Sequence, residues 1–289
     1  MIIEIDPHAG PCPGVKRALR MAEEKLHQGE PLVAVGPIIH NRAETNRLSE
    51  LGLTTVDQTT VEQGGTQALQ GRSVFIRSHG ISKRLFQTVE QESKRIVNGT
   101  CPVVQRIQQM IAEYHAEGNQ IIIVGKPSHP EVLGLNGHCE NQAIVVQQEA
   151  DIQNVDTSKP SVLLSQTTIA QATFFKMRDL LLQRMPNLIV NDTTCRQVNR
   201  RHENIRKFAK RVDVVLLIGG KHSSNTRVLY EKSRECNSNT HWIESAADLD
   251  PRWFSPDDHV GITGSASTPL WQLQNIQQYL ESGSERSAA

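Results

Sequence analysis

A cysteine recurs in similar surroundings at three places in the chain, each time shortly after a strand-like apolar run. Residues 96–103 (IVNGTCPV) are echoed by residues 189–198 (IVNDTTCRQV), where one more residue precedes the cysteine. A looser third copy has an apolar run at residues 2–5, followed by Cys12 in a turn rich in proline and glycine. Cys12, Cys101 and Cys195 are 89 and 94 residues apart. This spacing predicts three similar units that each contribute one thiolate to a shared metal centre.

Strand-like and helix-like segments alternate almost throughout the chain, which is the pattern of parallel α/β sheets. We expect strands at residues 31–36, 73–77, 120–124, 161–165, 212–218 and 259–263. After each cysteine the apolar residues follow a helical period. The three expected stripes are Val15, Ala18, Leu19, Ala22 and Leu26; Val103, Ile107, Met110, Ile111 and Tyr114; and Val198, Ile205, Phe208 and Ala209.

Cutting the chain at the cysteines gives three segments of similar length. The expected units are residues 13–100, residues 101–194 and residues 195–281, the last joined by the N-terminal strand 1–12. Each would hold two strands besides the one that ends at a cysteine, which predicts three-fold pseudosymmetry. Residues 282–289 are expected to form a disordered tail.

Composition removes several classes of function. The 31 basic residues balance the 31 acidic ones, so no overall field attracts nucleic acid or an anionic membrane. The chain lacks a secretion signal and any apolar run near ~18 residues, so we expect a soluble, cytoplasmic protein. Five cysteines, an odd count, in a reducing compartment indicate metal binding or catalysis rather than a disulfide framework.

Polar residues follow the expected strands. In parallel α/β sheets ligands bind outside the carboxyl ends of the strands, and histidines, hydroxyls and amides suit a phosphate or diphosphate. A single histidine there is more often a capping or surface residue, and Ser-Ser-Asn is more often an N-cap, but six repeated positions favour one cavity. These positions are His40 to Arg42, Ser78 to Gly80, Ser128 to Glu131, Gln166 to Thr168, Lys221 to Asn225 and Ser265 to Ser267.

Glu131 differs from this set because a carboxylate repels a diphosphate. It could simply interact with a helix dipole. Its position among ligand-like groups favours a second interpretation, that of a proton donor or relay.

Three thiolates suit a soft metal centre, and the two main candidates are zinc and an iron–sulfur cluster. Structural zinc usually uses close Cys-x-x-Cys pairs, none of which occurs here, so zinc is the minority interpretation. A cubane cluster with three cysteine ligands leaves one iron open for a substrate oxygen. Cys139 and Cys236 lie outside the repeat and are expected to be small, partly buried residues.

The ordered motifs resemble those of the 4-hydroxy-3-methylbut-2-enyl diphosphate reductases, the IspH/LytB family, from about residue 1 to residue 280. The motifs that carry the resemblance are Cys12, His40-Asn41-Arg42, His79-Gly80, Thr100-Cys101-Pro102, His129-Pro130-Glu131-Val132, Gln166-Thr167-Thr168, Cys195, Ser223-Ser224-Asn225 and Ala266-Ser267. Two positions depart from the family's common Asp-Ala-Thr-Cys-Pro phrase, since Asn98 and Gly99 replace its Asp and Ala. Residues 196–200 look like one branch of the family.

The resemblance implies a pseudo-three-fold trefoil of parallel-sheet α/β units around one [4Fe–4S] cluster, bound by Cys12, Cys101 and Cys195, with one open iron site. It implies reduction of the allylic diphosphate alcohol to isopentenyl and dimethylallyl diphosphates, the last step of the non-mevalonate (MEP) pathway. Glu131 would deliver protons, and Thr167 and His129 would orient the hydroxyl and its relay. The implied substrate ligands are His40, His79, His129, Thr167, Ser223, Ser224, Asn225 and Ser267.

No Gly-x-Gly-x-x-Gly fingerprint follows a strand, so electrons are expected from an external ferredoxin- or flavodoxin-type donor. A monomer is expected, with no nucleic acid or membrane partner. Two alternatives stay open: a non-catalytic iron–sulfur redox sensor or diphosphate-binding paralogue, and a zinc-dependent hydrolase.

Overall fold

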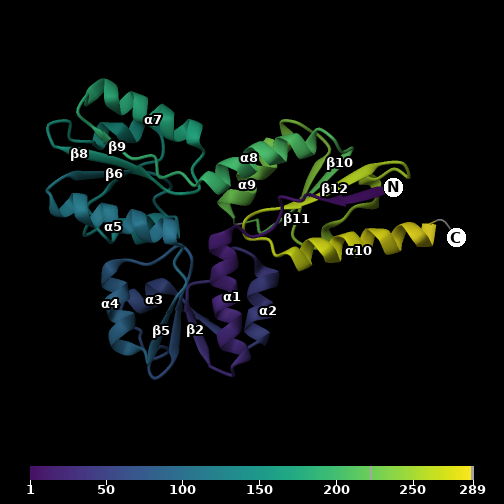
Figure 1. The fold of residues 1–289 in the computed structure, drawn as a ribbon, viewed down its shortest axis with the longest axis horizontal. Helices are drawn as coiled ribbons and strands as arrows, with labels where there is room; N and C mark the ends of the chain where they lie inside the picture. Colours follow the sequence, from purple (N-terminus) through teal and green to yellow (C-terminus); the bar gives the residue numbers. More distant parts are fainter. Residues whose placement is uncertain (222, 288–289) are drawn as a thin grey trace. The chain divides into compact units, whose positions relative to one another are not determined.

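The computed structural model describes residues 1–221 and 223–287, and within them all named sheets are parallel and four-stranded (Figure 1). The predicted fold class, α/β with three similar parallel-sheet units, is confirmed. The side chain of Ser224, a predicted ligand, and all of His222 lie outside the described residues.

The first sheet has the strand order β3-β2-β4-β5. Its strands are β2 (Leu32–Val35), β3 (Leu53–Val56), β4 (Ser73–Ile76) and β5 (Arg95–Asn98). The helices of this part of the chain are α1 (Pro13–His27), α2 (Arg42–Glu50), α3 (Gln58–Glu62) and α4 (Lys83–Glu92). Both central strands, β2 and β4, are buried along their whole length, as a parallel sheet requires.

The second sheet has the order β7-β6-β8-β9. It consists of β6 (Gln120–Val124), β7 (Ile144–Val146), β8 (Ser161–Ser165) and β9 (Ile189–Val190). Its helices are α5 (Pro102–Ala116), α6 (Pro130–Asn136) and α7 (Gln171–Arg184), with a 3-10 helix at Glu149–Asn154. Helices α5 and α7 contribute to two separate apolar clusters, one with Ile121, Ile123 and Val162 and the other with Ile122 and Leu163 (Figure 1).

The third sheet has the order β1-β12-β10-β11. Its strands are β1 (Ile2–Ile5), β10 (Val214–Ile218), β11 (Thr240–Ile243) and β12 (His259–Gly264). Its helices are α8 (Arg196–Ala209), α9 (Ser224–Arg234) and α10 (Leu270–Ser287), with 3-10 helices at Ala246–Asp248 and Pro251–Trp253. Alternate residues of β10 face opposite clusters: Val215 and Leu217 pack with α8, and Leu216 packs with α10.

The three sheets share one topology, and each contains an edge strand that the sequence did not reveal. These strands are β3, β7 and β11, which pair with β2, β6 and β10, respectively. They have three or four residues and are only partly buried. Such short edge strands lack the long apolar run that identifies a buried parallel strand.

The expected helical stripes agree with the observed burial, with one difference. Ala18, Leu19, Ala22 and Leu26 are buried in α1, and Val198, Ile205, Phe208 and Ala209 are buried in α8. In α5 the buried residues include Val104, Ile107 and Ile111, whereas Val103 is 44% exposed. The stripe therefore begins one residue later than expected, because Val103 occupies the solvent side of the first turn.

By compactness the chain divides into two units rather than three. One holds the third sheet and comprises Met1–Lys16, Ile39–Arg47 and Arg196–Ala289; the other holds the first two sheets and comprises Arg17–Ile38 and Leu48–Cys195. Each sheet nevertheless takes all its strands from one of the three expected segments, whose status as domains stays a prediction. Helix α10 continues through residues 282–287, which were expected to be disordered, and residues 288–289 lie outside the described residues.

Among the helices that the structure describes, none combines the length and the apolar character needed to cross a membrane.

The first two α/β layers pack closely at Gly137, at the end of α6. A Cβ atom built on Gly137 would lie 2.1 Å from the Cβ and 2.8 Å from the Cα of Ser82, whereas one on Gly134 would meet nothing nearer than 3.5 Å. Gly134 therefore has room for the methyl group of an alanine. Gly137 does not, because the backbone of Ser82 occupies the space.

We expect Gly137→Ala to lower the free energy of unfolding by about 1–3 kcal/mol, because overpacking displaces backbone. Gly134→Ala, on the same helix, is the matched control and should be neutral or stabilising by up to about 1 kcal/mol, since alanine favours a helix. Urea denaturation of both variants measures the difference. Equal stability of the two would contradict the close approach.

Candidate functional site

The strands that precede the three cysteines end in the same local turn. The Oδ1 atoms of Asp6, Asn98 and Asp192 accept hydrogen bonds from the backbone N–H two residues later, at 2.9, 3.0 and 3.0 Å. This is the Asx turn, in which a short side chain replaces a backbone acceptor. Asp192, rather than Asn191, therefore occupies the position of Asn98, and the copies that end at Cys101 and Cys195 have equal length before the cysteine.

Each of the three cysteines lies directly before a long helix, as predicted. Cys12 precedes α1, Cys101 is the N-cap of α5 without capping it through its side chain, and Cys195 precedes α8. None of the chain's five cysteines, all of which the structure describes, forms a disulfide, and these three are partly exposed. Thiols that are accessible at helix N-termini fit a soft metal centre.

The other two cysteines do not share this setting. Cys139 is buried, its thiol lies 3.2 Å from the carbonyl oxygen of Asn136, and burial raises the pKa of this thiol to about 11. Cys236 packs against the apolar cluster between α8 and β10. Both match the expectation of small residues within packing layers.

The backbones of two cysteines bond to the strand-end residues that the sequence singled out. The amide N–H of Cys195 donates to the carbonyl oxygen of Thr167 at 2.9 Å, and that of Cys101 donates to Ser78 at 3.1 Å, next to His79. The structure thus brings each of these cysteine turns beside a polar strand end of the same sheet.

Glu131 and Thr167 form a buried pair. Glu131 is 2% exposed, and its Oε1 accepts from the backbone N–H of Thr167 at 2.6 Å. The Thr167 hydroxyl donates to Oε2 at 2.7 Å. Both carboxyl oxygens therefore accept a hydrogen bond from Thr167, which fixes the orientation of the carboxyl group. The two residues are 36 positions apart in the sequence.

Burial raises the pKa of Glu131 to about 7, although both hydrogen bonds from Thr167 act in the opposite direction. Among the residues that the structure describes, no basic side chain contributes to this shift. A carboxyl group with a pKa near 7 can hold a proton at neutral pH and release it, which is the requirement for a general acid.

His129 is the N-cap of α6, and its Nδ1 accepts from the backbone N–H of Glu131 at 3.2 Å. With Nδ1 as the acceptor, the neutral ring carries its proton on Nε2. The ring of His79 lies edge-on to that of His129, with the centroids 5.5 Å apart. The two predicted histidines therefore lie side by side, and one of them is bonded to the backbone of Glu131.

Gln166 fixes the turn on which this group is built. Its side-chain oxygen accepts from the backbone N–H of Lys126 at 3.1 Å, and its amide donates to the Thr168 hydroxyl at 2.5 Å. A Cβ atom on Gly125 would lie 2.9 Å from Val132 and 3.1 Å from the Gln166 side chain. The strand ends of β6 and β8 are thus locked together without room for a larger residue.

The remaining predicted residues lie in the unit of the third sheet. Ser223 is buried and caps α9 by accepting from the Thr226 N–H at 3.2 Å, and the Ser267 hydroxyl lies 2.9 Å from that of Ser265. His40 lies in the segment Ile39–Arg47 of the same unit. Asn225 has both its side-chain oxygen and its nitrogen buried, with no hydrogen-bond partner among the described residues.

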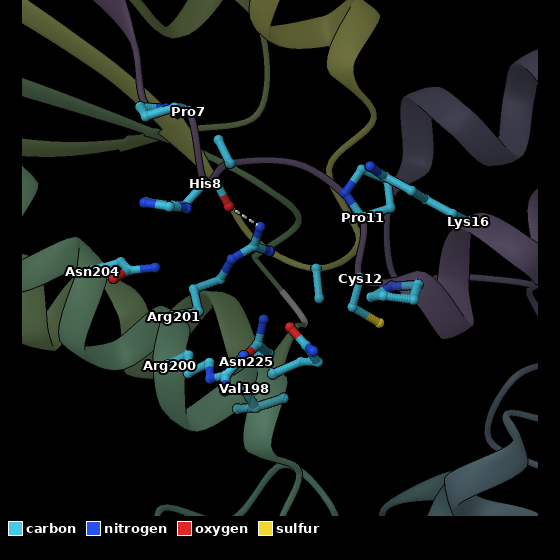
Figure 2. Close-up of a pocket in the computed structure, with 14 residues that line it drawn as sticks. Pro7, His8, Pro11, Cys12, Lys16, Val198, Arg200, Arg201, Asn204 and Asn225 are labelled. Carbon is cyan, nitrogen blue, oxygen red and sulfur yellow. Dashed lines mark hydrogen bonds between the residues drawn. The ribbon is translucent and has the colours of Figure 1, made fainter.

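Asn225 and Cys12 line one cavity of about 340 Å³ (Figure 2). The sequence did not predict the basic residues around it, Lys16, Arg200 and Arg201. Arg201 donates a hydrogen bond to the carbonyl oxygen of His8, while its Nη1 is buried without a partner among the described residues. The unpartnered amide of Asn225 and the guanidinium of Arg201 lie in the same cavity as a thiol, and such donors suit an anionic ligand. The arginines that follow Cys195 in the sequence were the signal that could have revealed this basic lining.

We expect the stability of the cluster-free protein to fall between pH 5 and pH 8 relative to that of Glu131→Gln. An unfolded glutamate loses its proton near pH 4.5, whereas folded Glu131 keeps it to about pH 7, so the native state binds more protons in between. The difference corresponds to a loss on the order of 3 kcal/mol. Urea unfolding at both pH values measures it. Glu90→Gln, an exposed change, is the control, and a pH-independent difference between wild type and Glu131→Gln would disprove the shift.

Comparison with known proteins covers nearly the whole chain. The family model described as LytB protein matches residues 3–281. Proteins named 4-hydroxy-3-methylbut-2-enyl diphosphate reductase are similar: that of Clostridioides difficile is 35% identical, over 97% of this chain and 99% of its own length. That of Caldanaerobacter subterraneus is 36% identical, over 98% of this chain and 97% of its own length.

Two solved structures are also similar. One, described as (E)-4-hydroxy-3-methyl-but-2-enyl diphosphate reductase, the terminal enzyme of the non-mevalonate pathway, has 34% identity and a TM-score of 0.74 and covers 98% of this chain and 100% of its own. The Plasmodium falciparum E-1-hydroxy-2-methyl-but-2-enyl-4-diphosphate reductase, at 22% identity, has a TM-score of 0.84, covers 96% of this chain and 87% of its own, and supports the fold. The resemblance identified from the ordered motifs is confirmed, and the chain belongs to the LytB family of reductases.

Proposed function

We propose that this protein removes the hydroxyl group of 4-hydroxy-3-methylbut-2-enyl diphosphate by reduction. Two electrons and two protons enter, the allylic carbon–oxygen bond breaks, water leaves, and isopentenyl and dimethylallyl diphosphates form. This is the last step of the non-mevalonate pathway. Membership of a family whose curated relatives carry this reductase name supports the proposal.

The observation that carries the chemistry is the buried Glu131–Thr167 pair. In the protonated carboxyl, Oε1 still accepts from the Thr167 N–H, and Oε2 can donate its proton to the Thr167 hydroxyl. That hydroxyl can then donate onward to the leaving oxygen. Loss of a hydroxyl group as water needs such an acid, whereas a protein that only binds a diphosphate or senses redox state has no use for it.

The diphosphate needs hydrogen-bond donors, and two sets of residues can supply them. Hydroxyl and amide donors lie in the unit of the third sheet, and His79 lies edge-on to His129, whose ring is bonded to the backbone of Glu131. With its proton on Nε2, His129 can donate to a phosphate oxygen or to the substrate hydroxyl. The proposed donors in the unit of the third sheet are His40, Ser223, Ser224, Asn225 and Ser267.

The family implies an iron–sulfur cofactor, and the cysteine set fits one. We assign Cys12, Cys101 and Cys195 as the ligands of one [4Fe–4S] cluster with one iron open to substrate. The three thiols are partly exposed and lie directly before a helix, whereas Cys139 is buried and Cys236, although partly exposed, does not precede a helix. When bound, the cluster supplies single electrons and Lewis acidity.

Anaerobically reconstituted protein should be brown, contain iron and acid-labile sulfide, and convert the substrate when a reduced donor is supplied. Glu131→Gln should keep the Kd for the diphosphate substrate within about threefold but lower kcat by about 10²-fold or more, because only the proton source is lost. Glu90→Gln is the control. A cluster-loaded wild type without turnover would disprove the enzyme assignment, and a colourless protein with one zinc would favour a hydrolase.

We further propose that the electrons come from an acidic one-electron carrier of the ferredoxin or flavodoxin type. The chain is neutral as a whole, but Lys16 and Arg200 are exposed on the rim of the cavity that contains Cys12. Helix α8 carries five basic residues, two of them Arg200 and Arg201, against one glutamate. A local positive surface beside a proposed cluster ligand suits an acidic partner. A cytoplasmic location and a monomeric state stay predictions.

Arg200→Glu should raise the KM for reduced ferredoxin by about 10-fold at low salt, and the effect should shrink above roughly 0.3 M salt, where surface charges are screened. Turnover with a small chemical reductant should stay unchanged, because that donor needs no docking surface. Lys210→Glu, an equal charge change outside the cavity, is the control. If both variants respond alike, docking does not involve this rim.

A further inference from the structure

Two side-chain amides, 231 residues apart in sequence, form a buried pair in the unit of the third sheet. Asn41 is 4% exposed and Gln272, at the start of α10, is 6% exposed. The Nδ2 of Asn41 donates to the Oε1 of Gln272 at 2.8 Å. Buried amides are retained where their hydrogen bonds are complete, because an unpaired one is costly.

The remaining amide atoms, the Oδ1 of Asn41 and the Nε2 of Gln272, also form hydrogen bonds, each to the backbone of a different segment. The Oδ1 of Asn41 accepts from the N–H of Glu44 at 3.0 Å and so caps the start of α2. The Nε2 of Gln272 donates to the backbone carbonyl of Glu244 at 2.6 Å, just after β11. The pair therefore ties the turn that carries His40 to the end of an edge strand.

Glu244 extends the connection to a second turn. Its Oε1 accepts from the backbone N–H of Lys221 at 2.8 Å. Trp242, two residues earlier, donates from Nε1 to the carbonyl of Gly219 at 2.6 Å and accepts at its own carbonyl from the Lys221 ammonium. The turn that leads from β10 to Ser223 and Asn225 is thus held from β11.

The two turns also approach each other directly. A Cβ atom on Gly220 would lie 2.5 Å from the carbonyl oxygen of His40, so only a glycine allows this approach. The N–H of Ser223 donates to the Gly220 carbonyl at 3.0 Å. Any shift of Gly220 would therefore move Ser223 with respect to His40.

We propose that Gln272, with Asn41 and Glu244, is a positioning residue that sets the spacing between two diphosphate-binding turns, the one with His40 and the one with Ser223 and Asn225. The inference rests on the proposed function, which assigns those turns to the diphosphate. None of the three residues is itself a proposed ligand. Their contribution is to hold the donors at a fixed separation, so that binding does not have to order them.

The first test uses Gln272→Leu in the cluster-loaded enzyme, with Gln278→Leu, an exposed change on the same helix, as the control. Leucine removes both side-chain hydrogen bonds of Gln272, so we expect the KM for the diphosphate substrate and the inhibition constant of inorganic diphosphate to rise by about 10-fold. The kcat, the iron content and the cluster's absorption spectrum should match those of the control.

The second test avoids the core, because Glu244 is exposed. Glu244→Ala removes the acceptor for the Lys221 N–H and should weaken inorganic diphosphate binding about 3- to 10-fold. Glu244→Gln keeps an oxygen in the same place and should bind within twofold of wild type. This rescue distinguishes positioning from a loss of negative charge, which both variants share.

The proposal is overturned if the inhibition constants of Gln272→Leu and Gln278→Leu agree within twofold, or if Glu244→Gln weakens binding as much as Glu244→Ala does. If Gln272→Leu fails to fold, the Glu244 pair decides. A wild type that binds inorganic diphosphate but does not turn over the substrate would remove the proposed function, while the comparison of binding among the variants would still judge the positioning of the turns.

Discussion

The buried carboxyl of Glu131 is the constraint on which the arrangement around the second sheet depends. It is kept in the interior by two hydrogen bonds from Thr167, whose carbonyl in turn accepts from the N–H of Cys195. Through its own N–H, Glu131 also sets the tautomer of His129. One short set of hydrogen bonds therefore connects the Glu131 carboxyl, the His129 ring and the turn that leads to Cys195.

Repetition supplies the frame for this chemistry. All three sheets have the same strand order, and in each one edge strand, β1, β5 or β9, leads through an Asx turn to a cysteine. The units then differ in what they add at their strand ends. Those of the first two sheets carry histidines and an acid, whereas that of the third carries hydroxyls, amides and the basic cavity beside Cys12. The three units therefore share a topology but differ in the side chains of their turns. Residues in turns can vary in type because, unlike those of the buried strands, they are not constrained by packing.

Much of this could be predicted from the sequence, and the errors have local causes. The fully buried strands, such as β2 and β10, are continuous apolar runs and were recognised, whereas the short edge strand β11 was not. Asn191 was aligned with Asn98 because the residue types match, but the hydrogen bond to Thr194 shows that Asp192 is the equivalent residue. The predicted stripe of α5 began at Val103, but packing buries Val104 instead, because two adjacent apolar residues at the start of a helix give no local sign of which one faces the core.

By itself the sequence determined the α/β class, the three cysteines before helices and the polar strand ends, because these follow from local periodicity and from side-chain chemistry. Only the tertiary structure decided that Glu131 is buried with Thr167, and hence that the pKa of its carboxyl lies near 7. It alone paired Asn41 with Gln272 and set Gly220 against His40. Burial and hydrogen bonding between distant segments depend on how the strands are ordered and packed, and no local pattern of residues encodes those distances.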